Sequence, residues 1–372
     1  MQFSVTHNDT ESLARAAWLK TAHGTIETPA FMPVGTRGTV KAVSPRELCE
    51  LNSAIILCNT YHLWVRPGVE SIESAGGLHQ FISWDRPILT DSGGYQVFSL
   101  SRLRKITAEG VKFQSHLDGS PLFLGPKEAM GIQKALGSDI AMVFDECPPY
   151  PCEYNAAVIS LDHTLKWAVD CREFDREPSQ LYFGIVQGSV YQDLREKCLQ
   201  ALMGMDFDGY ALGGLSVGEP EDVMFNVIDW LKHELPENKP RYLMGVGTPP
   251  QIVKAVAQGI DMFDCVLPTR VGRNGCAYTA AGMKQIKGGR YKNDSSPIES
   301  KCGCYACQNF TKAYIRHLLN VGEILGLRLL TLHNLYFYQK LMEDIRKTIN
   351  DGTFSAFKQT FLNGYAPPQK AA

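Results

Sequence analysis

The sequence lacks the features that tie a protein to a membrane or to export. Its longest apolar runs, such as SAIILC, are far too short to span a bilayer. The first residues, MQFSVTHNDTESLARAAWLK, show no basic segment followed by an apolar stretch, so no secretory leader is visible. Internal repeats and low-complexity tracts are also missing. These absences predict a globular, cytoplasmic protein that works without a membrane.

Paired cysteines and a strong net charge are missing as well. The eleven cysteines are odd in number and mostly scattered singly, which is typical of reduced thiols rather than of a disulfide framework. A net charge of −2 excludes a uniformly basic coat, so any site for a polyanion must be a local patch. The absence of G-x-G-x-x-G and Walker patterns argues against nucleoside-triphosphate chemistry.

What the sequence does contain is a series of short apolar runs that end in glycine or a polar residue. Such runs suit strands that are buried on both faces. Helix-like segments with serine, proline or acidic start signals lie between most of them. Eight runs have this form, at residues 29–35, 54–61, 87–95, 140–147, 181–188, 209–216, 241–247 and 261–268.

Eight strands that alternate with helices predict an α/β protein with a single (β/α)8 TIM barrel over residues 1–372. A doubly wound open sheet is the alternative, because alternation alone does not separate the two folds. Residues 96–124 alternate like a small antiparallel hairpin inserted after the third strand. Residues 275–345 predict a zinc-binding subdomain inserted late in the barrel.

That subdomain is predicted from the stretch KCGCYACQNF, which holds Cys302, Cys304 and Cys307. Three thiolates within six residues can converge on one tetrahedral ion. His333, 26 residues after Cys307, is the best candidate for the fourth ligand because an intervening helical hairpin could return it. A closed Cys3His shell predicts one structural Zn2+ per chain, with a metal-free cysteine turn as the alternative. The other histidines show no ligand-like grouping.

Three aspartates follow apolar runs at predicted strand ends, namely Asp91, Asp145 and Asp264. In a barrel, the carboxyl ends of the strands carry the active site. Two carboxylates that face one pocket can act as nucleophile and as general acid/base. Taken singly, each aspartate has a structural alternative, such as capping a turn or pairing with an arginine. The three together favour a functional role.

Glycine pairs at 93–94 and 213–214 adjoin two of the predicted strand ends. Glycine there lets a ligand approach the backbone closely. The backbone groups, with Asp145 and Gln187, suit the polar edge of a flat heterocycle, and its faces suit cover by two further side chains, Tyr95 and Met244.

The segment from Cys265 to Asn293 has no acidic residue. We call its six basic residues the basic strip: Arg270, Arg273, Lys284, Lys287, Arg290 and Lys292. Such asymmetry is typical of contact with a phosphate backbone. A solvated basic face is the alternative, but the position directly after Asp264 favours RNA binding.

Together these motifs resemble those of the bacterial-type, or queuine-type, tRNA-guanine transglycosylases. The matching stretches run in order along nearly the whole chain: FMPVGTRGTVKAVSP, ILCNTYHLWVRPG, TDSGGYQVFSL, DECPPYP, GIVQG, ALGGLSVGE, YLMGVGTP, DCVLPTRVGRNG and the cysteine–histidine array. The resemblance implies a (β/α)8 barrel with a zinc module. It also implies an enzyme, expected as a homodimer, that exchanges the wobble guanine of tRNAs with GUN anticodons for a 7-deazaguanine base.

The resemblance further implies roles for individual residues. Asp264 is the expected nucleophile at the ribose C1′, forming a covalent intermediate, and Asp91 the expected general acid/base. The base is expected to lie against Ser92, Gly93, Gly94, Tyr95, Asp145, Cys147, Gln187, Gly214, Leu215, Val217 and Met244. The anticodon stem–loop is expected on two loops, formed by Gly245, Val246, Gly247, Thr248, Pro249, Pro250 and Gln251 and by Thr269, Arg270, Val271, Gly272 and Arg273. Zinc is expected on Cys302, Cys304, Cys307 and His333.

The incoming base is expected to be preQ1 (7-aminomethyl-7-deazaguanine). Cys147 and Val217 match the bacterial pattern, in which the pocket suits a small aminomethyl group. Salvaged queuine is the alternative base. A barrel glycosidase or nucleosidase would use the same carboxylates with water and release the base. A non-catalytic RNA-binding subunit would be expected to lose a catalytic aspartate, and this chain has both Asp91 and Asp264.

Overall fold

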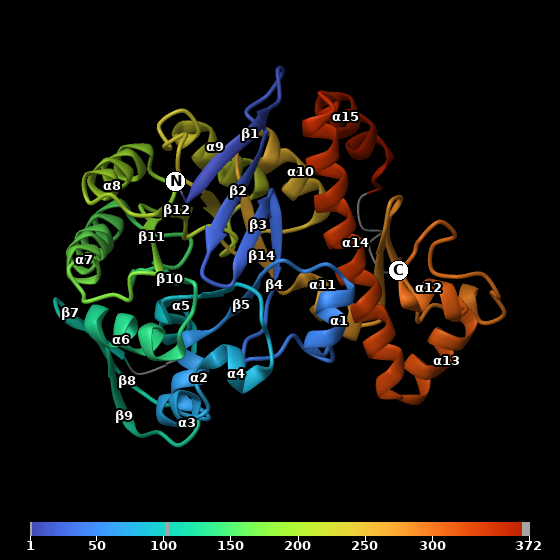
Figure 1. The fold of residues 1–372 in the computed structure, drawn as a ribbon, viewed down its shortest axis with the longest axis horizontal. Helices are drawn as coiled ribbons and strands as arrows, with labels where there is room; N and C mark the ends of the chain where they lie inside the picture. Colours follow the sequence, from blue (N-terminus) through green and yellow to red (C-terminus); the bar gives the residue numbers. More distant parts are fainter. Residues whose placement is uncertain (1, 101–103, 367–372) are drawn as a thin grey trace.

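Eight parallel strands form a nearly closed barrel, as a computed structural model that describes residues 2–100 and 104–366 shows (Figure 1). From the second strand to the eighth, each strand pairs with the next one along the chain, and the eighth pairs with the first. A bridge between Val34 and Leu57 closes the ring. The strands are β4 (Ala30–Pro33), β5 (Ile56–Cys58), β6 (Ile88–Thr90), β10 (Ile140–Met142), β11 (Leu181–Val186), β12 (Gly209–Leu212), β13 (Arg241–Leu243) and β14 (Met262–Cys265).

This closure confirms all eight predicted strands and excludes the doubly wound sheet. Nearly every strand residue is buried, as expected for strands covered on both faces. The predicted start signals also hold: Ser44 caps α1 with both hydrogen bonds of a capping box. The covering helices are α1 (Pro45–Glu50), α2 (Thr60–Val65), α3 (Val69–Ser74), α4 (Leu78–Ile82), α6 (Pro126–Leu136), α7 (Tyr154–Arg172), α8 (Gln192–Gly204), α9 (Glu221–Leu231) and α10 (Pro249–Ala257).

The predicted β insertion after the third barrel strand is confirmed, and it is larger than a hairpin. Helix α5 (Gly94–Leu100) comes first. An antiparallel sheet of three strands follows, made of β7 (Arg104–Thr107), β8 (Gly110–Gln114) and β9 (Pro121–Leu124). Residues 101–103 of the predicted insertion lie outside the described residues.

An N-terminal antiparallel sheet was not predicted from the sequence. It consists of β1 (Phe3–Asn8), β2 (Arg15–Thr21) and β3 (Gly24–Thr28). Arg15 contacts Asp261 just before β14, and His23 contacts Asp139 just before β10. The sheet therefore covers the N-terminal ends of the barrel strands, opposite the end at which the predicted active-site residues lie.

The segment after β14 builds a smaller unit beside the barrel (Figure 1). It contains α11 (Leu267–Arg273), β15 (Cys276–Thr279), β16 (Gly282–Gln285), a 3-10 turn (Gly289–Tyr291), α12 (Tyr305–Asn309), α13 (Lys312–Val321), α14 (Ile324–Asn350) and α15 (Phe354–Gly364). Its own cluster of buried side chains supports the proposed subdomain at 275–345. Helix α14 contributes to this cluster and to the barrel core. No helix in the described residues is long and apolar enough to cross a membrane.

A buried ion pair lies at the N-terminal ends of the barrel strands. We expect loss of this ion pair to destabilise the fold strongly. Arg15 Nε and Nη2 donate to the two oxygens of Asp261 at 2.9 and 2.6 Å. Replacing Arg15 by Met leaves that carboxylate buried without its charge partner, so the free energy of unfolding should fall by about 3–5 kcal/mol. Urea unfolding followed by circular dichroism measures this.

The matched control is the exposed pair Lys254–Glu221. Because solvent screens that pair, Lys254→Met should change the free energy of unfolding by about 1 kcal/mol or less. Equal losses in the two variants would contradict the assignment of Arg15 as the dominant contact.

Candidate active site and metal centre

Five strands bring residues of the predicted site to one rim of the barrel. Asp91 follows β6, Asp145 lies three residues after β10, and Gln187 follows β11. Met244 follows β13, and Asp264 lies within β14. Because these strands are parallel neighbours, their carboxyl ends meet at the same rim. Residues far apart in the sequence thus face one site.

Asp91 is a buried carboxyl group held by three donors. The Thr60 amide donates to Oδ1 at 2.9 Å, Gln96 Nε2 donates to Oδ2 at 2.8 Å, and Asn59 Nδ2 also donates to Oδ2. Burial raises the pKa of Asp91 to about 6, although these bonds favour the charged form. A carboxyl group that exchanges its proton near neutral pH suits general acid/base chemistry.

Asp264 is held by one oxygen only. The Tyr242 hydroxyl donates to Oδ1 at 2.5 Å and the Gly245 amide at 2.8 Å, whereas Oδ2 accepts no hydrogen bond from the described residues. Burial raises the pKa of Asp264, and the two bonds oppose that rise. Burial also raises the pKa of Tyr242 well above its usual value, with added effects from Asp264 and Asp91. Of the two carboxylates, only Asp264 bonds to this hydroxyl, and Asp91 acts on it through its charge.

Asp145 and its neighbours form a polar wall beside these carboxylates. Ser92 Oγ donates to Asp145 Oδ1 at 3.0 Å, and Gln187 Nε2 donates to Oδ2 at 2.7 Å. Burial raises the pKa of Asp145 to about 6. A Cβ at Gly94 would lie only 2.7 Å from the Asp145 carbonyl oxygen, and one at Gly214 only 2.4 Å from Gln187 Oε1. Gly94 therefore requires glycine because it meets backbone, and Gly214 requires it because its φ is +65°.

The remaining residues predicted to bind the base differ in their exposure. Tyr95 on α5 is 53% exposed, so its ring is free to cover a ligand. Met244, Cys147 and Val217 are half-buried. Leu215 is buried. Gly93 packs against Tyr61 rather than standing open, since a Cβ there would lie 3.4 Å from the Tyr61 amide nitrogen.

The residues predicted to bind RNA are not all in loops. Residues 245–248 form a turn after β13, and Pro249, Pro250 and Gln251 begin α10, which Thr248 caps. Residues 269–273 form part of helix α11 rather than the predicted loop.

Within α11, two residues of the predicted RNA contact face the protein. Thr269 and Gly272 are buried, and a Cβ at Gly272 would lie 3.0 Å from the Thr331 amide nitrogen. Arg270 is exposed, and Arg273 is partly exposed. Among the described residues, no member of the basic strip forms an ion pair, so its charges are available to a polyanion.

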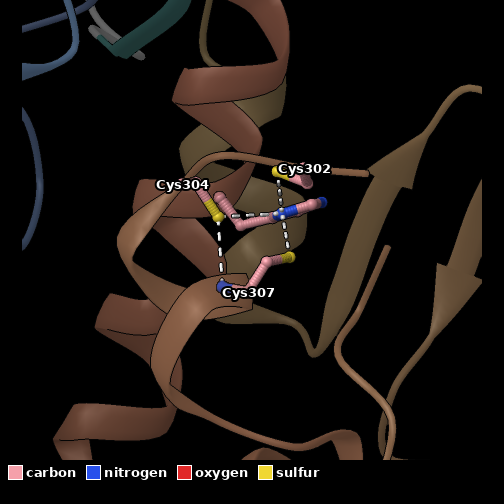
Figure 2. A group of neighbouring side chains, drawn as sticks. Cys302, Cys304 and Cys307 are labelled. Atoms are coloured by element: carbon pink, nitrogen blue, oxygen red, sulfur yellow. Dashed lines mark hydrogen bonds between the residues drawn. The ribbon is translucent and has the colours of Figure 1, made fainter. Parts of the chain in front are cut away.

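The predicted metal ligands come together in the smaller unit. Figure 2 shows the side chains of Cys302, Cys304 and Cys307 converging on one point beside α12. Their sulfur atoms lie 3.7, 3.4 and 3.4 Å from His333 Nδ1, which α14 supplies. Ligand atoms around a tetrahedral ion bound at about 2.0–2.3 Å are roughly 3.5 Å apart. The buried Cys3His group therefore fits one metal ion.

The histidine is oriented by the backbone of the neighbouring hairpin. His333 Nε2 lies 2.7 Å from the Tyr278 carbonyl oxygen, which only accepts hydrogen bonds. Nε2 therefore carries the proton and Nδ1 keeps its lone pair for a metal. With four protein ligands the shell is closed, which is typical of structural rather than catalytic sites.

The structure also groups two histidines that the sequence did not. His23 Nδ1 and His79 Nε2 lie 2.9 and 3.2 Å from the oxygens of Asp139. Their rings are stacked, with centroids 3.6 Å apart and planes 16° from parallel. Imidazole lone pairs lie in the ring plane, so two stacked rings do not both point at one ion. We interpret the group as one imidazole, that of His23, hydrogen-bonded to the carboxylate, and a second, that of His79, within ion-pair distance of it.

Several residues that shape the site had no sequence signal of their own. Tyr242 lies inside the apolar run RYLMGVG, which predicts a core strand residue. Asn59 gave a weak signal, since it follows the strand-like run ILC directly. Only the strand register shows that these side chains reach the carboxylates.

A (β/α)8 barrel with buried carboxylates at its rim and a Cys3His module defines a class of barrel proteins equipped for nucleophilic and acid–base chemistry. A model of the queuine tRNA-ribosyltransferase family matches residues 9–367. A queuine tRNA-ribosyltransferase from Pelotomaculum thermopropionicum is 54% identical over 365 residues, covering 98% of this chain and 99% of that protein. Those from Thermoanaerobacter sp. and Lysinibacillus sphaericus are 53% and 52% identical over 366 residues, covering 98% of this chain and 98% and 96% of those proteins.

The chain therefore belongs to the queuine tRNA-ribosyltransferase family, whose members are pentosyltransferases that act on tRNA. This confirms the resemblance to the bacterial-type tRNA-guanine transglycosylases.

Removal of one metal ligand should empty the metal site and loosen the smaller unit. Cys304→Ser is expected to reduce bound metal from about one ion per chain to near zero and to lower the unfolding temperature, because the ion holds α12 to α14. Elemental analysis and thermal circular dichroism measure the two effects. Cys276→Ser, a partly exposed cysteine of the same unit, serves as control. A wild-type protein that is folded and free of metal would contradict the site.

Proposed function

We propose that this protein exchanges the wobble-position guanine of tRNAs with GUN anticodons for preQ1, a step of queuosine biosynthesis. One observation carries this proposal: the partly buried Asp264 and the buried Asp91 lie at the same rim of a barrel that belongs to a tRNA-ribosyltransferase family, and both carboxylates raise the pKa of Tyr242. Asp145 and Gln187 supply a polar wall next to them. Together these groups meet the needs of N-glycosidic bond exchange.

In the proposed reaction Asp264 is the nucleophile. Its Oδ2, which has no donor among the described residues, attacks the ribose C1′ while Tyr242 and Gly245 hold Oδ1. The N-glycosidic bond breaks, and Asp91 gives its proton to the departing guanine. Asp91 then takes a proton from the incoming base. The base nitrogen attacks C1′ and Asp264 is released, so the two steps mirror each other.

The base is proposed to bind against the polar wall. Asp145 accepts hydrogen bonds from N–H groups of the base, and Gln187 Nε2 donates to its carbonyl group. Tyr95 and Met244 cover its two faces, and the backbone at Gly214 approaches its edge. The half-buried Cys147 and Val217 favour the small aminomethyl group of preQ1 over queuine. Ser92, Gly93, Gly94 and Leu215 shape the pocket.

The tRNA anticodon stem–loop is proposed to lie across the basic strip and the turn at 245–251. Arg270 and Arg273 come shortly after Asp264 in the chain, and they have no ion-pair partner within the described ranges. Lys and Arg side chains that neutralise phosphates provide affinity without reading sequence. The sequence of the anticodon would then be read at the pocket itself.

Three further features belong to the proposal. The metal is Zn2+, since a closed set of three thiolates and one imidazole is typical of structural zinc. The location is the cytoplasm, supported by eleven free cysteines. The assembly is a homodimer, supported by the exposed aromatic side chains of Tyr305 and Tyr314 on the metal-binding unit.

The covalent intermediate gives the decisive test of the function. Protein is incubated with a GUN-anticodon tRNA and a base analogue that does not complete the exchange, then denatured and run on a gel. We expect an RNA-linked band with the wild type and none with Asp264→Asn, because the amide is a far poorer nucleophile. A band that persists in Asp264→Asn would overturn the nucleophile assignment.

Companion reactions separate the alternatives. Release of guanine from tRNA without uptake of a new base would favour a ribosyl hydrolase. Uptake of queuine in preference to preQ1 would favour salvage. Two variants serve as controls. Asp264→Glu keeps a carboxylate but moves it, so exchange should be lost although the charge is kept. Lys254→Met lies on α10, where Lys254 is paired with Glu221, and it should leave exchange unchanged.

The hydrogen bond from Tyr242 to Asp264 should determine how kcat/KM for base exchange depends on pH. Asp264 attacks only as a carboxylate, and the Tyr242 hydroxyl favours that form. In Tyr242→Phe the pKa of Asp264 therefore rises, and the acid limb of kcat/KM moves to higher pH. At acidic pH kcat/KM should fall about tenfold, with a smaller loss at alkaline pH.

The pH profile of guanine exchange measures this shift. Tyr182→Phe is the matched control, because that buried barrel tyrosine has a hydroxyl without a partner in the described part of the chain. An acid limb unchanged in Tyr242→Phe would show that Asp264 does not control it.

A further inference from the structure

A buried arginine lies directly behind the wall at which the base is proposed to bind. Arg195, in the first turn of α8, has no exposed surface. Burial lowers the pKa of Arg195 to about 10, so the guanidinium still carries its charge at neutral pH. It forms no ion pair with any carboxylate of the described residues. A buried, unpaired cation is unfavourable for folding and calls for a functional reason.

Arg195 ties together two loops at the barrel rim. Its Nε donates to the Ser189 carbonyl at 2.7 Å, and its Nη1 donates to the carbonyls of Val186 at 2.7 Å and Gly213 at 2.8 Å. Val186 ends β11 and Gly213 follows β12. The segments before Gln187 and before Gly214 are therefore held by one planar group. This fixes the two backbones from which the base wall is built.

Two polar atoms beside these hydrogen bonds have no hydrogen-bond partner among the residues described. They are Arg195 Nη2 and Gln187 Oε1, and both are buried. A Cβ at Gly214 would lie 3.4 Å from the first and 2.4 Å from the second, so both atoms face the same small space. A guanidinium only donates hydrogen bonds and an amide oxygen only accepts them. The two atoms are complementary, and one water molecule can join them.

The Gln187 amide thus lies between groups of opposite character. On one side, Asp145 accepts a hydrogen bond from Nε2. On the other side, the donor groups of Arg195 face Oε1. A flipped amide would put Oε1 against the Asp145 carboxylate and Nε2 against the Arg195 N–H groups. Both contacts would then be repulsive. Only one amide orientation is compatible with both neighbours.

We propose that Arg195 is a positioning residue that locks the orientation of the Gln187 amide and so selects bases with a carbonyl acceptor over bases with an amino group at that position. This inference rests on the proposed function and deepens it. Arg195 does not touch the base. It acts through Gln187, whose amino group is then always presented to the ligand.

The test measures base discrimination rather than activity alone. Uptake of labelled guanine into tRNA gives KM for guanine. Inhibition of that uptake gives the inhibition constant of 2,6-diaminopurine, in which an amino group replaces the carbonyl. In the wild type guanine should bind far better. In Arg195→Met the ratio of the two constants should fall at least about tenfold, because only the contact with Asp145 then orients the amide, while KM for tRNA stays unchanged.

A second variant and a double variant keep the test independent of folding. Arg195→Lys keeps the charge but not the planar fork, so a partial fall in the ratio is expected. Gln187→Ala gives the ratio without the amide, and adding Arg195→Met to it should change the ratio no further.

Arg241 provides the matched control at the other end of the barrel. It is also buried, and its Nη2 donates to the Leu235 carbonyl at 2.7 Å. Arg241→Met should lower the unfolding temperature but leave the ratio at its wild-type value. An unchanged ratio in Arg195→Met, or an equal fall in Arg241→Met, would overturn the inference alone. A wild type that takes up no guanine would overturn the proposed function together with it.

Discussion

The parallel closure of the eight strands is the constraint on which the rest of the structure depends. A parallel ring sends all carboxyl ends to one rim, so short polar segments after separate strands become neighbours. At the opposite rim the N-terminal sheet covers the strand starts and shields the Arg15–Asp261 pair. One end of the barrel is thereby covered and stabilises the fold, and the other end carries the candidate active site.

The two ends treat their carboxyl groups in opposite ways. At the closed end, burial would raise the pKa of Asp139, but the interactions with His79, the Ile88 amide and His23 outweigh it and lower the pKa to about 2. That carboxylate stabilises the fold above the unfolded pKa, and the effect is lost as the pH falls toward 2. At the open end burial raises the pKa of Asp91 and Asp145 to about 6. Their contribution is present below the unfolded pKa and lost as the pH rises through about 6, so the site weakens the fold at neutral pH.

How far the sequence predicted this structure follows from the kind of signal each element gives. Apolar runs and turn residues predicted the eight strands, because burial on both faces leaves a local pattern. Close cysteine spacing predicted three of the metal ligands, because it is also a pattern within a short stretch of sequence. The N-terminal sheet, the third strand of the insertion and the helical form of residues 269–273 were missed. Tyr242 and Arg195 were missed because their partners lie across the sheet, at positions that the register sets and the local sequence does not show.

Helix α14 links the predicted metal centre to the rim. His333 and Asn334 are neighbours on that helix; the first faces the three thiols, and the second bonds to the Pro268 carbonyl at 2.9 Å in α11. One turn further on, the Tyr338 hydroxyl donates to the Gly247 carbonyl at 3.0 Å. Gly247 lies in the same turn as Gly245, whose amide holds Asp264. A closed metal shell with no open position can thus influence the chemistry of Asp264 without meeting the substrate, because it fixes the helix against which both α11 and this turn are packed.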